Sequence, residues 1–171
     1  VRIEALRRQR WTGAQIAAEL KVSAATVSRV LRRLGLNRMR DLGPAELEAA
    51  VRQHAEPIGA DVRVTSGADL EQGYPLIAAV GRAASKDRAP CLIELEWGRA
   101  DHPRVAVIGK GVCFDSGGLD LKPASGMRLM KKDMGGAAHA LALARLIAAE
   151  RLPVRIHLLI PAVENAVSGN A

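Results

Sequence analysis

The residues best suited to chemistry gather between positions 109 and 136, in the stretch GKGVCFDSGGLDLKPASGMRLMKKDMGG. Four of its charged residues stand on backbone that we expect to be irregular, between a strand and a helix: Lys110, Asp115, Lys122 and Asp133. Carboxylates are hard oxygen ligands that suit a divalent cation, and a lysine can join them only after its ammonium has lost its proton. The pattern predicts a metal or anion site, with ordinary loop glycines and surface charges as the alternative.

Strands and helices alternate around this stretch. Hydrophobic periodicity predicts helices at 44–54, 75–85 and 134–150, and strands at 61–66, 91–97, 104–110 and 154–161. The fold class is therefore α/β, with helices that cover a mixed sheet. Because only the short segment GRADHP joins them, we expect strands 91–97 and 104–110 to be antiparallel neighbours.

Charge separates the beginning of the chain from the rest. The 171 residues include 25 Lys and Arg against 18 Asp and Glu, a formal net charge of +7. Residues 1–40 hold ten of the basic residues and only two acidic ones, so the remainder is nearly neutral. Such an asymmetry predicts two units with different roles, at residues 1–41 and 42–171.

The basic unit has the pattern of short helices separated by tight turns. Thr12 and Ser23 are expected N-caps of helices at 14–20 and from 24 to about 34. Two helices joined by a short turn match the helix-turn-helix arrangement, whose second helix enters the major groove of double-stranded DNA. The expected base contacts come from Ser23, Ala25, Thr26 and Arg29, and the expected phosphate contacts from Arg32, Arg33 and Arg38.

The segment WTGAQIAAELKVSAATVSRVLRRLGLNR resembles the helix-turn-helix at the N-terminus of insertion-sequence transposases and related resolvase-like DNA binders. The match is carried by Ala17 and Ala18 at the helix crossing and by three valines in core positions, Val22, Val27 and Val30. Lys21 departs from it, because a glycine is common at that turn. The resemblance implies DNA binding, whereas the acidic catalytic triad of a transposase is not found downstream. A short solvated basic surface is the alternative interpretation.

Three stretches of the larger unit resemble successive signature sequences of the leucyl aminopeptidase (cytosol aminopeptidase) family: GKGVCFDSGGLDLKP, MRLMKKDMGGAA and LIPAVENAVSGNA. The likeness runs from about Leu42 to Ala171. Members of this family are two-metal exopeptidases that hydrolyse the amino-terminal residue from peptides. The resemblance therefore implies two divalent ions, Mn or Zn, as cofactors, peptides as substrates, and a homo-hexamer as the assembly.

The same resemblance implies roles for single residues. Lys110 and Asp133 would be ligands of the more exchangeable metal, and Asp115 would bridge both metals. Lys122 would polarise the scissile carbonyl or stabilise the gem-diolate, and Met130 would line the pocket for the first side chain of the substrate. The family's remaining ligands, an aspartate and a glutamate, and its catalytic arginine belong to an NTDAEGR-like motif that this sequence does not contain.

We therefore expect a partial aminopeptidase catalytic domain, inactive alone and preceded by a helix-turn-helix. Strand 154–161 would form an open hydrophobic edge of its sheet and make the isolated chain poorly soluble. The main competing hypotheses are a DNA-binding protein with a passive aminopeptidase remnant, and an artefactual fusion at the junction NRMRDLGPAEL.

Other features bound the class of protein. No stretch approaches the length of a membrane span and no signal peptide opens the sequence, so we expect a cytoplasmic protein without a membrane partner. Cys91 and Cys113 have no metal-type spacing, which predicts two buried thiols. The aromatic content of 2% argues against a stacking platform for single-stranded nucleic acid.

Overall fold

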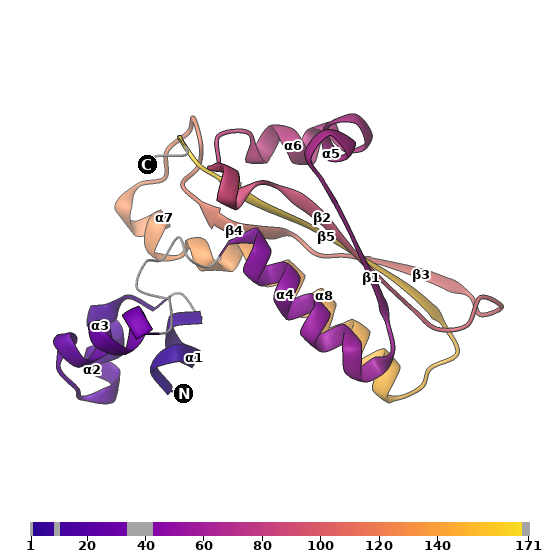
Figure 1. Cartoon of the computed structure of the whole chain (residues 1–171), viewed down its shortest axis with the longest axis horizontal. Helices are drawn as coiled ribbons and strands as arrows, with labels where there is room; N and C mark the ends of the chain where they lie inside the picture. The colour runs from indigo at the N-terminus through magenta and orange to yellow at the C-terminus, as the bar shows by residue number, and fades with distance from the viewer. Residues whose placement is uncertain (1, 9–10, 34–42, 169–171) are drawn as a thin grey trace. The chain divides into compact units, whose positions relative to one another are not determined.

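Residues 2–8, 11–33 and 43–168 are described by the computed structural model of the chain. They belong to two units, Val1–Leu42 and Gly43–Ala171. The described part of the first unit is helical, and the second contains a five-stranded mixed sheet with helices on both faces (Figure 1). None of the helices described is long and apolar enough to cross a membrane.

Three short helices make up the described part of the first unit: α1 (Arg2–Arg8), α2 (Gly13–Leu20) and α3 (Ala24–Arg33). A capping box begins α2, because Thr12 Oγ1 accepts from the Gln15 N–H at 3.2 Å and Gln15 Oε1 accepts from the Thr12 N–H at 2.8 Å. Ser23 Oγ accepts from the Thr26 N–H at 3.1 Å at the start of α3. Both expected N-caps are confirmed.

The turn between α2 and α3 depends on a left-handed residue. Lys21 has φ 51° and ψ 41°, a conformation in which its Cβ is strained. The N–H groups of Lys21 and Val22 donate to carbonyls in the last turn of α2, at 3.3 and 3.1 Å. Ile16 and Val27, both 0% exposed, form the small core beneath this turn, with Trp11 packed against them.

Helices and strands alternate through the second unit. Its helices are α4 (Pro44–Ala55), α5 (Gly67–Gly73), α6 (Pro75–Gly81), α7 (Ala124–Arg128) and α8 (Gly135–Ala149), with short 3-10 helices η2 (Glu56–Ile58), η3 (Lys86–Arg88) and η4 (Met130–Met134). Its strands are β1 (Asp61–Ser66), β2 (Cys91–Trp97), β3 (Arg104–Ile108), β4 (Gly111–Asp115) and β5 (Arg155–Asn165). Strands β1 and β2 have the expected bounds, whereas α5, α7 and β4 lie where the sequence predicted no regular element.

Strand β5 lies at the centre of the sheet. The strand order is β1-β2-β5-β3, and β4 also pairs with β5. Strand β2 is antiparallel to β1 and β5, while β3 and β4 are parallel to β5. The expectation that 91–97 and 104–110 are antiparallel neighbours is wrong, because β5 inserts between them. The expectation of an open edge at 154–161 is wrong for the same reason, since β1 and β3 end the strand order.

Helices cover both faces of this sheet unequally. Figure 1 shows α4 and α8 side by side on one face, and the shorter α5 and α6 on the other. The main core lies under α4 and α8. Its fully buried side chains come from the helices and the two central strands: Val51, Leu95, Ala137, Ala144, Ile156, Leu158, Ile160 and Ala162. Cys91 and Cys113 are buried in the same cluster, as the sequence predicted.

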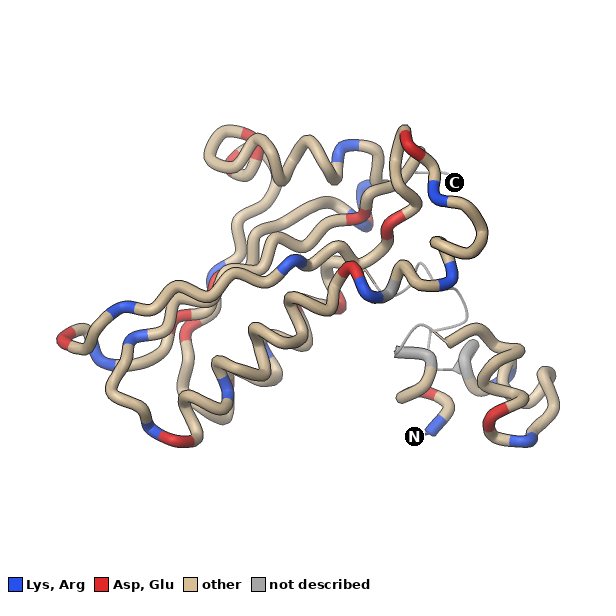
Figure 2. The backbone as a smooth tube through the Cα atoms, turned by 180° about the vertical axis from the view of Figure 1, so that it is seen from behind, with Lys and Arg blue, Asp and Glu red and all other residues tan. Residues whose placement is uncertain are grey.

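Charged side chains in the second unit are largely paired with one another. Acidic and basic residues are interspersed along its strands and helices (Figure 2). Arg63 on β1 lies 2.8 Å from Glu94 on β2, and Arg155 on β5 lies 2.6 Å from Glu96. The hydrogen bond from Arg155 lowers the pKa of the Glu96 carboxyl. The net charge of this unit is therefore near zero, and opposite charges also lie next to one another within it.

Candidate metal and catalytic site

The four charged residues singled out in the sequence come from segments around β4 and η4. Lys110 immediately precedes β4, and Asp115 is its last residue. Lys122 follows in the segment before α7, and Asp133 lies in η4 just ahead of α8. The expectation of irregular backbone is therefore wrong for Asp115 and Asp133, because a strand and a helical turn hold them.

Lys122 lies between the two aspartates. Its Nζ donates to Asp115 Oδ2 at 2.8 Å and to Asp133 Oδ2 at 2.7 Å. Lys110 Nζ donates to Asp133 Oδ1 at 2.8 Å, and Lys132 Nζ donates to the same oxygen at 3.1 Å. The structure thus brings Lys110, Asp115, Lys122 and Asp133 into one cluster. Two carboxylates converge on one ammonium, and carboxylate oxygens are ligands that a divalent cation prefers.

The lysines keep the buried Asp133 carboxyl ionised. Its side chain is only 5% exposed, and burial by itself would raise its pKa. The hydrogen bonds from Lys110, Lys122 and Lys132 outweigh burial and hold the pKa well below its usual range. Asp133 is therefore a charged acceptor throughout the neutral pH range.

Asp115 has partners that the sequence reasoning missed. Its Oδ1 accepts from the Gly117 N–H at 2.9 Å and from Asn165 Nδ2 at 3.0 Å. Burial opposes ionisation of this carboxyl, but the hydrogen bonds from Lys122, Gly117 and Asn165 lower its pKa. Asn165 lies in the signature stretch LIPAVENAVSGNA, and this resemblance was the sequence signal that could have pointed to it as a site residue. The predicted strand, however, ended at 161, whereas β5 continues to Asn165.

The donor set fits part of a divalent cation site. Carboxylate oxygens are the ligands that hard cations prefer, and an additional lysine nitrogen can bind only as a neutral amine. Within the described ranges, no group of three or more His, Cys, Asp or Glu side chains is placed to hold a metal ion. The described residues therefore supply two converging carboxylates, and a complete site would need further ligands.

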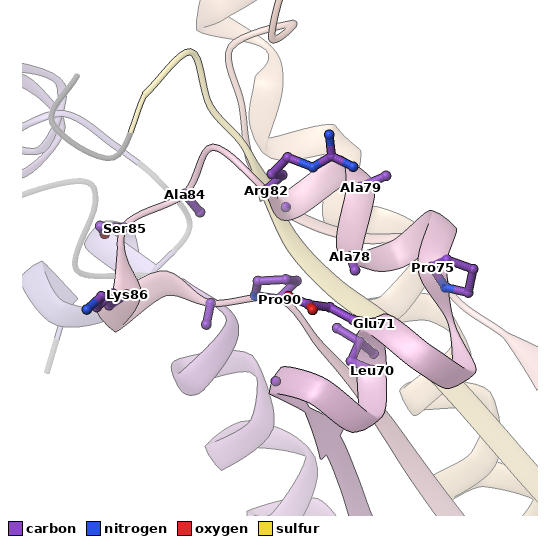
Figure 3. A pocket seen from close by; sticks show the side chains of 13 residues that line it. Leu70, Glu71, Pro75, Ala78, Ala79, Arg82, Ala84, Ser85, Lys86 and Pro90 are labelled. Carbon is purple, nitrogen blue, oxygen red and sulfur yellow. The ribbon is translucent and has the colours of Figure 1, made fainter.

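The larger cavity of the second unit lies away from this cluster of charged side chains. A cavity of about 620 Å³ lies between α5, α6 and the segment around η3, with Leu70, Pro75, Arg82 and Lys86 among its lining side chains (Figure 3). The predicted site residues do not line it. A smaller apolar hollow of about 340 Å³ borders Lys110. Met130, the predicted pocket residue, is buried at the start of η4.

The predicted DNA contacts fall on the first turns of α3. Ser23, Ala25 and Arg29 are exposed, and Thr26 is half-buried. The Ser23 hydroxyl caps the helix and lies 2.9 Å from the Thr26 hydroxyl, so the two side chains also bond each other. The structure does not describe the side chains of the three predicted phosphate contacts, Arg32, Arg33 and Arg38. DNA binding stays a prediction.

Comparison with known proteins identifies the larger unit. The sequence profile of the cytosol aminopeptidase family, catalytic domain, matches residues 29–171, beginning within α3 and thus ahead of the expected Leu42. A protein named "Probable cytosol aminopeptidase" from Rickettsia rickettsii (strain Sheila Smith) is 39% identical over 117 residues, which are 68% of this chain and 23% of that protein.

Solved structures agree with this match. The crystal structure of a cytosol aminopeptidase from Coxiella burnetii has 59% sequence identity and a TM-score of 0.72, covering 74% of this chain and 27% of that one. The bottromycin maturation enzyme BotP, solved in complex with Mn, has 38% identity and a TM-score of 0.67, covering 75% and 28%.

The mixed α/β fold and these matches define a metalloaminopeptidase-type catalytic domain. The chain belongs to the cytosol aminopeptidase (Peptidase M17) family. It spans about a quarter of the length of the relatives it matches. The comparisons do not show the predicted fusion to a transposase-type helix-turn-helix.

Proposed function

We propose that the second unit serves the hydrolytic release of N-terminal amino acids from peptides. The observation that carries this proposal is the convergence of Asp115 Oδ2 and Asp133 Oδ2 on Lys122 Nζ, at 2.8 and 2.7 Å. Divalent ions bound there, Mn or Zn, would supply Lewis-acid polarisation of a carbonyl and a water of lowered pKa. Membership of the family and the manganese complex of BotP support this choice of chemistry.

Each residue of the cluster then has a distinct task. Asp115 and Asp133 hold the cations through carboxylates that remain ionised at neutral pH. Lys110 would be a further ligand, a role that a lysine can take only as a neutral amine. Lys122 keeps its ammonium and donates to the carbonyl oxygen of the substrate, and Met130 contacts the first side chain of the peptide.

We further propose that this chain supplies only part of the working site. Two carboxylates and a lysine leave a two-metal centre short of ligands, and ligand number and orientation decide the affinity of such a centre. The relatives are about three times as long as this chain, and we infer that the missing ligands come from their additional length. We therefore expect very low peptidase activity from the chain alone.

The test measures Mn²⁺-dependent release of leucine from a leucyl amide substrate. The chain is assayed by itself and joined to the remaining catalytic segment of a cytosol aminopeptidase. In the joined protein, Asp115→Ala should abolish activity. Asp101→Ala is the control, because Asp101 is exposed and pairs only locally with Arg99 at 2.9 Å. Full activity of the Asp115→Ala protein would refute the role given to this carboxylate.

We propose a second function for the first unit, binding of double-stranded DNA. Its motivation is α3, which follows a three-residue turn and presents Ala25 and Arg29 to solvent. A small residue such as Ala25 lets the helix approach base edges closely, and an arginine such as Arg29 can bond a guanine bidentately. The excess of basic residues in positions 1–40 supplies attraction to phosphates.

Salt-titrated binding of the full chain to a DNA duplex tests this second function. Affinity should fall steeply with salt, and Arg29→Ala should cost about 1–3 kcal/mol if this side chain contacts a base. Arg99→Ala, an exposed arginine of the second unit, is the matched control. Binding that responds neither to salt nor to Arg29→Ala, or that prefers single strands, would remove the DNA role from the first unit.

A further inference from the structure

The two oxygens of the Asp115 carboxylate have different surroundings. Oδ2 accepts a hydrogen bond from Lys122 Nζ at 2.8 Å. Oδ1 accepts two, from the Gly117 N–H at 2.9 Å and from Asn165 Nδ2 at 3.0 Å. An ionised carboxylate offers about two acceptor positions on each oxygen, so the fold itself occupies both positions of Oδ1. Only Oδ2 is left to face a cation.

Asn165 is held firmly enough to impose this difference. It lies opposite Asp115 in the parallel β4–β5 ladder. Its carbonyl oxygen accepts from the Ser116 N–H at 3.0 Å and from the Ser116 hydroxyl at 2.8 Å. Its Oδ1 packs against Gly118, where an added Cβ would lie 2.5 Å away and where φ is +63°. The backbone of Asn165 is therefore tied to Ser116, while its side-chain amide lies against Gly118 and donates to Asp115.

We propose that Asn165 is a positioning residue, which fixes the Asp115 carboxylate so that Oδ2 alone is presented toward Lys122, Asp133 and a divalent cation. The cation in this statement rests on the proposed function, whereas the orientation of the carboxylate does not. A neutral amide is suited to this task because it engages one oxygen without adding a charge that would repel a metal.

The size of the effect follows from general experience with metal sites. Hydrogen-bond partners of ligating groups typically change metal affinity by about 10- to 100-fold. Without the Asn165 donor, the Asp115 side chain can rotate and offer either oxygen. The expected consequence is weaker binding of a divalent ion, although Asp115 and Asp133 are both still present.

Mn²⁺ titration of the whole chain by calorimetry tests the proposal in Asn165→Leu, which keeps the branched shape and the number of side-chain heavy atoms but has no hydrogen-bond donor. Its Mn²⁺ affinity should fall by about 10- to 100-fold. Trp97→Phe is the control, because it removes the hydrogen bond from Trp97 Nε1 to the Ile58 carbonyl, 3.0 Å long, near the other end of β2 and β5. This variant should keep wild-type affinity. Equal affinity of Asn165→Leu and wild type overturns the proposal.

Side-chain amide NMR of the metal-free chain provides a second readout that a merely structural role would not move. One Asn165 Nδ2 proton should be shifted downfield and exchange slowly with water, and Asp115→Ala, which removes the acceptor, should abolish both properties. If these signals are present but wild type binds no Mn²⁺, the metal site fails and the orientation stands. If the signals are absent, the positioning role is refuted whether or not Mn²⁺ binds.

Discussion

The two units of this chain are stabilised in different ways. The described part of the first has two fully buried side chains, Ile16 and Val27, and depends on helix caps. The described part of the second buries a cluster of fifteen residues between its sheet and two helices. Because the free energy of unfolding increases with the apolar area buried, we expect a much smaller free energy of unfolding for the first unit.

Charge is distributed differently as well. The first forty residues account for the net charge of the whole chain. In the second unit, opposite charges face one another across strands and in the cluster around Lys122 and Asp133. The total of +7 is therefore a property of the first unit. The chemistry of the second unit depends on ion pairs between neighbouring residues, which the net charge of the chain does not reveal.

The largest effect is expected from Leu158→Ala on the central strand. Leu158 is 0% exposed, so the truncation should lower the unfolding free energy of the second unit by about 2–5 kcal/mol. Thiol labelling measures this unit alone, because both cysteines are buried in it. Burial raises the pKa of the Cys91 thiol to about 11, so labelling of the folded unit is slow.

Ile16→Ala is the matched change in the first unit. It should melt the helices around Ile16 without accelerating thiol labelling. Accelerated labelling in Ile16→Ala would show that the two units unfold together, which would break the comparison.

Acid should weaken the second unit selectively. Although burial opposes it, the lysine hydrogen bonds keep the Asp133 pKa below its unfolded value. This contribution to stability is complete above the unfolded pKa of about 4 and is lost as pH falls toward the lower folded value. Asp133→Asn should therefore be less stable than wild type at neutral pH and lose less stability between about pH 5 and 3.

Urea unfolding at a series of pH values, in buffer with a chelator, measures this difference. Asp101→Asn is the control, because its carboxyl is exposed and pairs only with Arg99. Parallel pH profiles for Asp133→Asn and wild type would contradict the role of the lysine cluster in stability.

Substitution of a helix N-cap should destabilise the two units differently, with a smaller effect than the core substitutions. Thr12→Ala removes the capping box of α2 and should cost about 1 kcal/mol of the stability of the first unit. Ser66→Ala at the N-cap of α5 is the matched change, and it should cost little because Ser66 makes no side-chain cap hydrogen bond. Helical circular dichroism during thermal unfolding records both. A larger loss from Ser66→Ala would contradict this account.

The smallest expected effect is an increase in stability. Lys21 and Arg151 have left-handed backbone, with φ 51° and 50°, one in each unit. Replacing either by glycine should relieve about 1 kcal/mol of strain, partly offset by the flexibility of glycine in the unfolded chain. Calorimetry should show a larger rise in Tm for Lys21→Gly, because a smaller unit has a smaller unfolding entropy. A fall in Tm for both variants would exclude strain at these turns.

Prediction from the sequence worked best where structure depends on near neighbours. The N-caps Thr12 and Ser23 bond residues three positions away, and β1 and β2 have the bounds that the sequence predicted. It failed for β4, a five-residue strand in a glycine-rich stretch that is a strand only through its pairing with β5. It also stopped β5 too early and so missed Asn165.

The sequence by itself determined the types and positions of the charged site residues, the local caps, the asymmetry of charge and the signature stretches of the family. Only the tertiary structure decided the strand order, the central place of β5, and the pairing of Asp115 with Asn165, fifty positions apart. The physical reason is that neither residue can direct the other through local geometry. Their hydrogen bond forms only after β4 and β5 have paired in register within the sheet.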